Sequence, residues 1–184
     1  IAGGFNELIK TDETLPDNIK FDPRPKNMNE NEFKEYIDFV NYYIHQINLM
    51  RFLLGENFKV KFADKTKVLM VVESYSGIPG IIEMAPYKTS ISWEEKVFIS
   101  FEYGYIELSL PAPLVSNKAG KVKIYKDKPS PLTFIPQFPH ISAMYQQALN
   151  FINAIKGKIK PPSDAKDAFV DLLIAKEYLN LLKN

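Results

Sequence analysis

The stretch that decides the fold is Asn41-Tyr42-Tyr43-Ile44-His45-Gln46-Ile47-Asn48-Leu49-Met50-Arg51-Phe52-Leu53-Leu54-Gly55-Glu56. With the residues before it, it forms an apolar stripe whose members are four and three residues apart in turn: Tyr36, Val40, Tyr43, Ile47, Met50 and Leu54. This is the period of a helix that packs one side into a core. We therefore predict a helix that begins near Asn29, where Glu30 and Glu32 suit the positive end of its dipole, and ends near Gly55.

A polar stripe follows the same helix. Asn41, His45 and Asn48 keep the helical period about 100° round from the apolar stripe. Their hydrogen-bonding side chains line up where a neighbouring domain or a ligand can reach them. His45 is one of two histidines in the chain, and imidazole titrates near neutral pH. The alternative interpretation is a boundary histidine without chemistry beside solvated asparagines.

Length and composition indicate one domain over residues 1–184. The chain has 184 residues, of which 46% are hydrophobic, enough for a well-packed core. A net charge of +1, without long runs of one sign, gives no electrostatic footprint for nucleic acid or a membrane surface. The absence of cysteine excludes disulfides and thiolate metal sites and suits a reducing compartment, so we expect a cytoplasmic location.

The remaining chain predicts strands and then two helices. No apolar run approaches the roughly 20 residues that cross a bilayer, and the start, Ile1-Ala2-Gly3-Gly4, indicates a fragment rather than a signal peptide. Strands are predicted over residues 58–63, 66–75, 81–87, 93–103 and 105–110, with an edge strand over 121–125. A proline-rich loop over 128–139 precedes a helix over 140–155 closed by Gly157, and a last helix has Ser163 as N-cap.

This order of elements predicts an α+β fold: an open, mainly antiparallel β-sheet with helices packed on one face. The helices over residues 30–55, 140–156 and 164–182 together suffice for that face. The runs Val68 to Val72 and Val97 to Tyr105 place apolar side chains on both faces of their strands. The other face is therefore predicted to be an oligomer interface, in a homodimer or a tetramer.

The sequence contains no self-sufficient catalytic or cofactor motif. No two glycines stand two residues apart, which excludes the dinucleotide fingerprint, and no phosphate loop or nucleophile elbow is present. Glu94 and Glu95 point to opposite faces of a strand, so they form no acid/base pair. Asp164 and Asp167 are explained by the helix dipole and solvation. Two histidines without a spaced carboxylate give no zinc site.

The opening helix and the order of elements resemble the C-terminal domain of the Gfo/Idh/MocA oxidoreductases, the family of glucose-fructose oxidoreductase and inositol dehydrogenase. The matching segments are Gly3-Gly4 to Ile9-Lys10-Thr11-Asp12-Glu13, Asn41 to Glu56, the strand series to Leu110, Phe151-Ile152-Asn153-Ala154-Ile155-Lys156-Gly157 and Pro162-Ser163-Asp164-Ala165-Lys166-Asp167-Ala168. The resemblance thus covers most of the chain.

The resemblance implies a substrate-binding and oligomerisation domain of an NAD(P)-dependent dehydrogenase that acts on sugars, polyols or their derivatives. The family's N-terminal Rossmann domain, with the cofactor fingerprint and the lysine of a Glu-Lys-Pro motif, is absent here. NAD or NADP is therefore implied for the full-length enzyme, whereas we expect this chain alone to bind neither and to be inactive. Asp127-Lys128-Pro129 is a superficial match in the wrong place.

Within the helix, His45 matches the histidine of the family's Asp-x-x-x-His pattern. Asn41 stands where the first aspartate usually is, and Asn48 stands where a later one often is. An amide cannot accept a proton at ordinary pH, so the resemblance implies that His45 is the general acid/base group and that Asn41 and Asn48 bind substrate hydroxyls. Tyr42 and Lys10 are weaker candidates. The alternative is a non-catalytic ligand-binding or assembly module with this fold.

Overall fold

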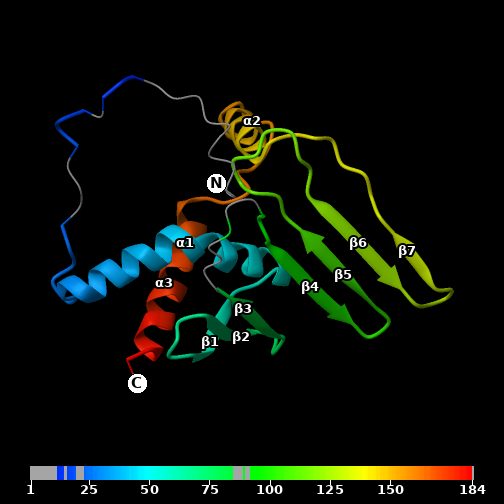
Figure 1. The fold of residues 1–184 in the computed structure, drawn as a ribbon, viewed down its shortest axis with the longest axis horizontal. Helices are drawn as coiled ribbons and strands as arrows, with labels where there is room; N and C mark the ends of the chain where they lie inside the picture. The colour runs from blue at the N-terminus through cyan, green and yellow to red at the C-terminus, as the bar shows by residue number, and fades with distance from the viewer. Residues whose placement is uncertain (1–11, 15, 20–22, 85–88, 90–91, 184) are drawn as a thin grey trace. The chain divides into compact units, whose positions relative to one another are not determined.

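The structure is a computed structural model that describes residues 12–14, 16–19, 23–84, 89 and 92–183 (Figure 1). Its elements are α1 (Glu30–Leu54), β1 (Phe58–Ala63), β2 (Leu69–Ser74), β3 (Pro79–Glu83), β4 (Lys96–Phe101), β5 (Gly104–Ser109), β6 (Lys121–Lys126), β7 (Leu132–Phe134), α2 (Ala143–Ile155) and α3 (Ala165–Leu181). Every strand pair is antiparallel. The predicted α+β class is therefore confirmed.

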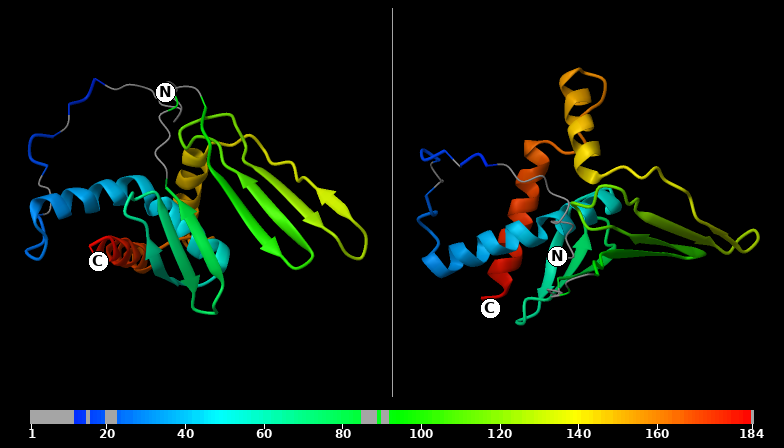
Figure 2. Two further views of the ribbon diagram at one scale, coloured as in Figure 1. Left: turned by 60° about the horizontal axis from the view of Figure 1, so that its bottom comes forward. Right: turned by 45° about the horizontal axis from the view of Figure 1, so that its top comes forward.

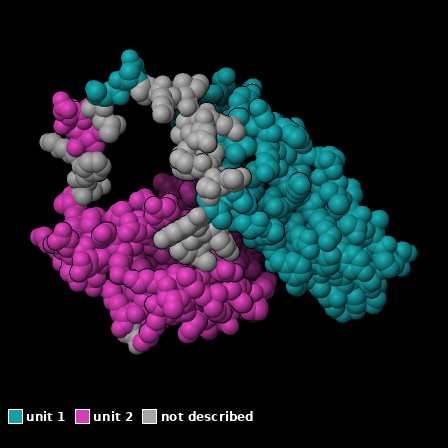
Figure 3. All heavy atoms as spheres, in the orientation of Figure 1, with its two compact units in different colours: residues 1–14, 88–162 teal, residues 15–87, 163–184 magenta. Residues whose placement is uncertain are grey.

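The strands form two sheets, whereas the sequence predicted one open sheet. One sheet has the order β1-β2-β3 and the other the order β4-β5-β6-β7. Contacts group the chain into two compact units, residues 15–87 with 163–184 and residues 1–14 with 88–162 (Figure 3). Each unit is described by itself below.

The unit that holds α1 is built on the predicted helix. Asn29 is its N-cap and shares a capping box with Glu32. Gly55 ends it with φ 69°, a left-handed conformation that glycine adopts without a Cβ penalty. The apolar stripe packs into the core as predicted: Ile47 is fully buried, and its other members are partly buried against the same cluster. Both the position and the buried face of this helix are therefore confirmed.

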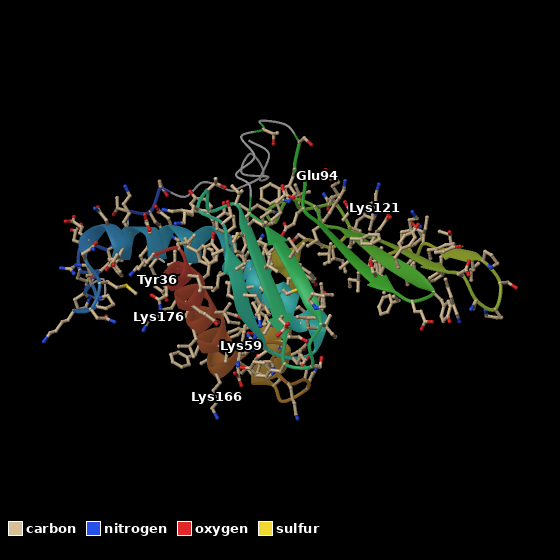
Figure 4. The ribbon with its side chains drawn as sticks, turned by 90° about the horizontal axis from the view of Figure 1, so that it is seen from below. Tyr36, Lys59, Glu94, Lys121, Lys166 and Lys176 are labelled. Carbon is tan, nitrogen blue, oxygen red and sulfur yellow. The ribbon has the colours of Figure 1, made fainter. Side chains whose placement is uncertain are left out.

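The core of this unit lies between α1, α3 and one face of the sheet (Figures 1 and 2). Met70 and Val72 of β2 are buried there, because alternate residues of a strand point to the same face. Helices α1 and α3 are neighbours in this layer, as Tyr36 and Lys176 show (Figure 4). Two helices thus cover this sheet.

The other unit contains β4 to β7 and α2. Residues 121–125 were predicted as an edge strand, but β6 lies between β5 and β7. Strand β7 lies inside the segment that was predicted to be a loop; it has three residues and forms the edge, where flanking prolines are tolerated. Helix α2 has no buried residue, so the prediction that three helices cover one sheet face is wrong for α2.

Two smaller findings concern the helices. Asp164, rather than the predicted Ser163, is the N-cap of α3, and its side chain accepts hydrogen bonds from the backbone N–H groups of Lys166 and Asp167. No helix in the described ranges combines the length and hydropathy that a membrane span requires.

One buried group in the core lacks a partner. Tyr178 of α3 is 1% exposed and stacks on Phe39, with 4.8 Å between ring centroids, yet among the described residues its hydroxyl has no hydrogen-bond partner. Burial, followed by the charge of Asp64 and then Tyr43, raises the pKa of Tyr178 to about 12. A buried hydroxyl without a partner destabilises the folded state by about 1–3 kcal/mol.

We expect Tyr178→Phe to raise the free energy of unfolding by about 1 kcal/mol at pH 7, because it removes this hydroxyl and keeps the ring. The unfolded tyrosine ionises near pH 10 and the folded one near pH 12, so stability of the parent falls as pH rises between these values. The variant should lack that contribution. Urea unfolding at pH 7 and pH 11 measures both effects; a less stable variant at pH 7 would show that the hydroxyl has a partner.

Candidate functional site

Helix α1 runs without interruption through residues 30–54, so Asn41, His45 and Asn48 lie on one of its faces as predicted. Their exposure differs along the helix: Asn41 and His45 are exposed, whereas Asn48 is half-buried. The imidazole of His45 is therefore open to a molecule that approaches this face. Asn48 lies closer to the neighbouring helix α3.

The side-chain amide of Asn48 is used within the fold. Its Nδ2 donates to Asp171 Oδ2 at 2.8 Å and to Asp167 Oδ2 at 3.1 Å. Both carboxylates belong to α3, one helical turn apart. Asn48 therefore connects two helices that are more than 100 residues apart in sequence.

Arg51, one turn further along α1, binds the same two carboxylates. Its Nη1 donates to Asp171 Oδ1 at 2.6 Å and its Nη2 to Asp167 Oδ1 at 2.7 Å. A third bond runs from Nη1 to the backbone oxygen of Asp167 at 3.0 Å, and a fourth from Nε to Asn57 Oδ1 at 2.9 Å. We call Asn48, Arg51, Asp167 and Asp171 the helix-pair network.

Every carboxylate oxygen of the network accepts a hydrogen bond from α1. The side chains of Arg51 and Asp171 are only 10% and 5% exposed, so loss of one partner would leave a poorly solvated charge. The network contains one cation and two anions. A neutral amide at position 48 therefore meets two carboxylates as a donor, whereas an aspartate there would add a third negative charge.

Asp167 is further stabilised as an anion at the beginning of α3. The pKa of Asp167 is lowered, first because Ser163 Oγ donates to its Oδ2 at 2.7 Å, and then because Arg51 and Asn48 donate to it. The residue also lies in the first helical turn, where the helix dipole favours negative charge. The sequence-based explanation of Asp167 by dipole and solvation was incomplete, because its main partners are on other elements.

The other predicted substrate contacts are not brought into this network. The side chain of Tyr42 is 71% exposed on α1, and Lys10 lies outside the described residues. The described residues contain no group of three or more His, Asp or Glu side chains that could bind a metal. A shallow hollow of about 400 Å³ lies elsewhere in the unit, lined by Lys59, Glu73, Ser74 and Tyr75, and none of the predicted site residues lines it.

Sequence reasoning missed Arg51, Asn57 and Asp171. A signal for the network was present in the spacing: Asn48 and Arg51 are three residues apart and Asp167 and Asp171 are four apart, so each pair occupies one side of its helix. The sequence alone did not show that α1 packs against α3. Asp171 carries a further signal, because it lies among apolar residues in Val170-Asp171-Leu172-Leu173, and a carboxylate in such a position requires a partner.

Comparison with solved structures identifies the fold. The chain matches a structure provisionally assigned as an NADPH-dependent oxidoreductase from Desulfitobacterium hafniense, with a TM-score of 0.62 and 11% identity over 79% of this chain and 46% of that one. It also matches aldose-aldose oxidoreductase from Caulobacter crescentus, crystallised with glycerol, with a TM-score of 0.53 and 16% identity over 76% of this chain and 43% of that one. The chain has the fold of a domain of these oxidoreductases.

A third match covers similar shares of both chains. An oxidoreductase by provisional assignment from Klebsiella pneumoniae gives a TM-score of 0.53 and 14% identity over 79% of this chain and 47% of that one. No family model matches the sequence, and no curated protein is significantly similar to it. The chain spans less than half the length of the structures that it resembles, and the resemblance drawn from the sequence is confirmed at the level of the fold.

The geometry around Asn48 gives a direct prediction. Asn48→Asp should lower the free energy of unfolding by about 2 kcal/mol, because it replaces a donor with a third carboxylate in a half-buried site. Adding Asp171→Asn should restore much of the loss, since the amide and carboxylate then exchange helices. Urea unfolding at pH 7 measures both variants.

The matched control is Asn41→Asp, the same change on an exposed part of α1, which should stay within about 0.5 kcal/mol of the parent. Equal free energies of unfolding for the Asn48→Asp and Asn41→Asp variants would mean that the contacts of Asn48 with α3 do not stabilise the fold.

Proposed function

We propose that the chain is the substrate-binding domain of an NAD(P)-dependent oxidoreductase of the Gfo/Idh/MocA family that acts on sugars, polyols or their derivatives. The observation that carries the proposal is the match of this fold to part of several oxidoreductases, combined with an exposed histidine on the helix that the family resemblance singles out. The aldose-aldose oxidoreductase with glycerol supports the substrate class.

The cofactor would be bound outside this chain. Its sequence has no glycine-rich dinucleotide fingerprint, so its residues do not fit the pyrophosphate of NAD(P) by that mode. That cofactor, held by the rest of the enzyme, would supply hydride transfer at the substrate carbon. We expect calorimetry of this chain with NAD(H) or NADP(H) to detect no micromolar binding.

The residues of this chain would handle the substrate hydroxyl and its proton. His45 is exposed and would take the hydroxyl proton during oxidation or return it during reduction, the general acid/base role that histidine most often has. Asn41, on the same face one turn earlier, would orient a hydroxyl through its amide. Tyr42 is exposed close by, and Lys10 stays a predicted contact.

Asn48 takes a different part in this proposal. Its amide nitrogen donates to two carboxylates of α3, so Asn48 would act by positioning α1 rather than by holding the substrate. His45 would then work without a carboxylate at either family position, since neither Asn41 nor Asn48 accepts a proton.

The competing function is a non-catalytic ligand-binding or assembly module. The observation that favours it is the neutral amide at both positions where the family pattern has aspartates. The two functions differ in whether His45 contacts a substrate and whether its loss reduces turnover. A polyol site without turnover would indicate the binding module.

Ligand binding is testable on the chain itself, because it has two histidines and their imidazole NMR signals are readily assigned by substitution. Titration with glycerol, sorbitol, inositol and glucose should shift the His45 signals and leave those of His140 in place. His140 lies in the other unit and is the internal control. Equal or absent shifts at the two histidines would contradict a polyol site at His45.

In the complete oxidoreductase, His45→Asn should lower kcat by about 10²-fold or more, the usual scale for a positioned acid/base group. The melting temperature should change little because His45 is exposed. Asn41→Ala is expected to affect KM more than kcat. Unchanged turnover in the His45 variant would remove its catalytic role and favour the binding module.

A further inference from the structure

The stripe of α1 that carries His45 continues in both directions along the helix. At about 100° per residue, a residue seven positions away returns to within about 20° of the same line. Phe52 follows His45 by seven residues, and Asp38 precedes it by seven. Both belong to α1 and both are exposed. His45 therefore lies midway between an aromatic ring and a carboxylate on one accessible line of the helix.

Phe52 takes no part in the core of its unit. It is 76% exposed, the largest fraction for a large apolar residue in the described part of the chain. It is absent from the cluster of apolar side chains between α1, α3 and the sheet. Within the described ranges, its ring also makes no aromatic or cation–π contact. The ring is consequently accessible to a bound molecule and contributes little to packing.

The separation of Phe52 from His45 determines which part of a substrate can reach the ring. Seven residues at about 1.5 Å per residue place the two positions about 10 Å apart along the helix axis. Asn48 and Leu49, which lie between them, are half-buried. A hexose bound with one hydroxyl at His45 would cover that intervening turn. The group joined to the far side of the hexose would then lie at Phe52.

The two ends of the line differ in the chemistry that they recognise. Asp38 and Asn41, before His45, have carboxylate and amide groups that hydrogen-bond to hydroxyls. Phe52, after His45, has only a ring, and aromatic rings pack against other rings by stacking or edge-to-face contact. A sugar would therefore direct its free hydroxyls towards Asp38, and a ring attached to it towards Phe52.

We propose that Phe52 is a specificity-determining residue, which packs against a second ring that the substrate carries through a glycosidic bond. The substrate is accordingly a glycoside rather than a free sugar or a linear polyol. This inference rests on the proposed function, because it takes His45 as the site of the reacting hydroxyl. Phe52 does not touch the reacting atoms, so its loss acts on KM more than on kcat.

The test is a titration of the chain with methyl β-D-glucoside, phenyl β-D-glucoside and cellobiose, followed by the imidazole NMR signals of His45. The first ligand has no second ring, the second has a planar ring and the third has a second sugar. We expect at least one of the two ringed ligands to bind about tenfold more tightly than methyl glucoside, the order of one ring–ring contact. The ligand that gains affinity identifies the kind of ring.

Variants of exposed phenylalanines assign this gain to one side chain. Phe52→Ala should raise the dissociation constant of the ringed ligand to that of methyl glucoside, whereas Phe52→Tyr, which keeps the ring, should retain most of the gain. Phe169→Ala is the matched control, because Phe169 lies on the surface of α3 and is 59% exposed. It should keep the full difference between the ligands. Circular dichroism checks that each variant is folded.

The outcomes separate this inference from the proposed function. If methyl glucoside shifts the His45 signals but a second ring brings no gain, Phe52 does not determine specificity, and the polyol site at His45 stands. The same holds if the gain persists in Phe52→Ala. If none of the three ligands shifts the His45 signals, the site at His45 is itself wrong, and the role of Phe52 is overturned with it.

Discussion

The guanidinium of Arg51 between Asp167 and Asp171 is the contact on which the arrangement of the α1 unit depends. It joins the end of the first helix to the beginning of the last, and its Nε–H also donates to Asn57, which immediately precedes the first strand region. The hydrophobic core brings α1 and α3 together without fixing their axial positions, because apolar contacts are not directional. Hydrogen bonds between planar groups are directional and set these positions.

The ion pairs of Arg51 with Asp167 and Asp171 limit which side chain can occupy position 48 beside them. Two carboxylates and one guanidinium leave an excess negative charge in a poorly solvated place, so the remaining member must donate hydrogen bonds and must not be an anion. Asn48 meets that requirement with its amide nitrogen. His45, one turn before Asn48 on the same stripe, lies outside this network and is exposed.

The parts that were predictable from the sequence are those with local causes. The helix over residues 30–54 has a capping box at Asn29, a left-handed glycine at its end and a continuous apolar stripe, and each of these signals is contained in the segment itself. The strand over residues 58–63 was found for the same reason. The unpredicted β7 has three residues between prolines, and only its pairing with β6 makes it a strand.

The parts that could not be predicted depend on contacts between distant segments. Asp167 and Asp171 gain their role only when α3 lies beside α1, and a single sequence does not report that pairing. The division of the strands into two sheets likewise depends on which strands pair with each other. The sequence of a single strand does not specify its partner. Which face of β4–β7 is apolar becomes evident only from the register, since both faces of β4 contain a large apolar side chain, Phe98 on one and Ile99 on the other.

A double-mutant cycle between Arg51 and Asp171 tests the central claim most directly. Free energies of unfolding would be measured in urea for the parent, Arg51→Ala, Asp171→Ala and the double variant, with the exposed pair Lys61 and Glu73, 3.1 Å apart, as the comparison cycle. We predict a coupling of about 2 kcal/mol for the buried pair and less than about 0.5 kcal/mol for the exposed one. Additive losses at Arg51 and Asp171 would contradict the account.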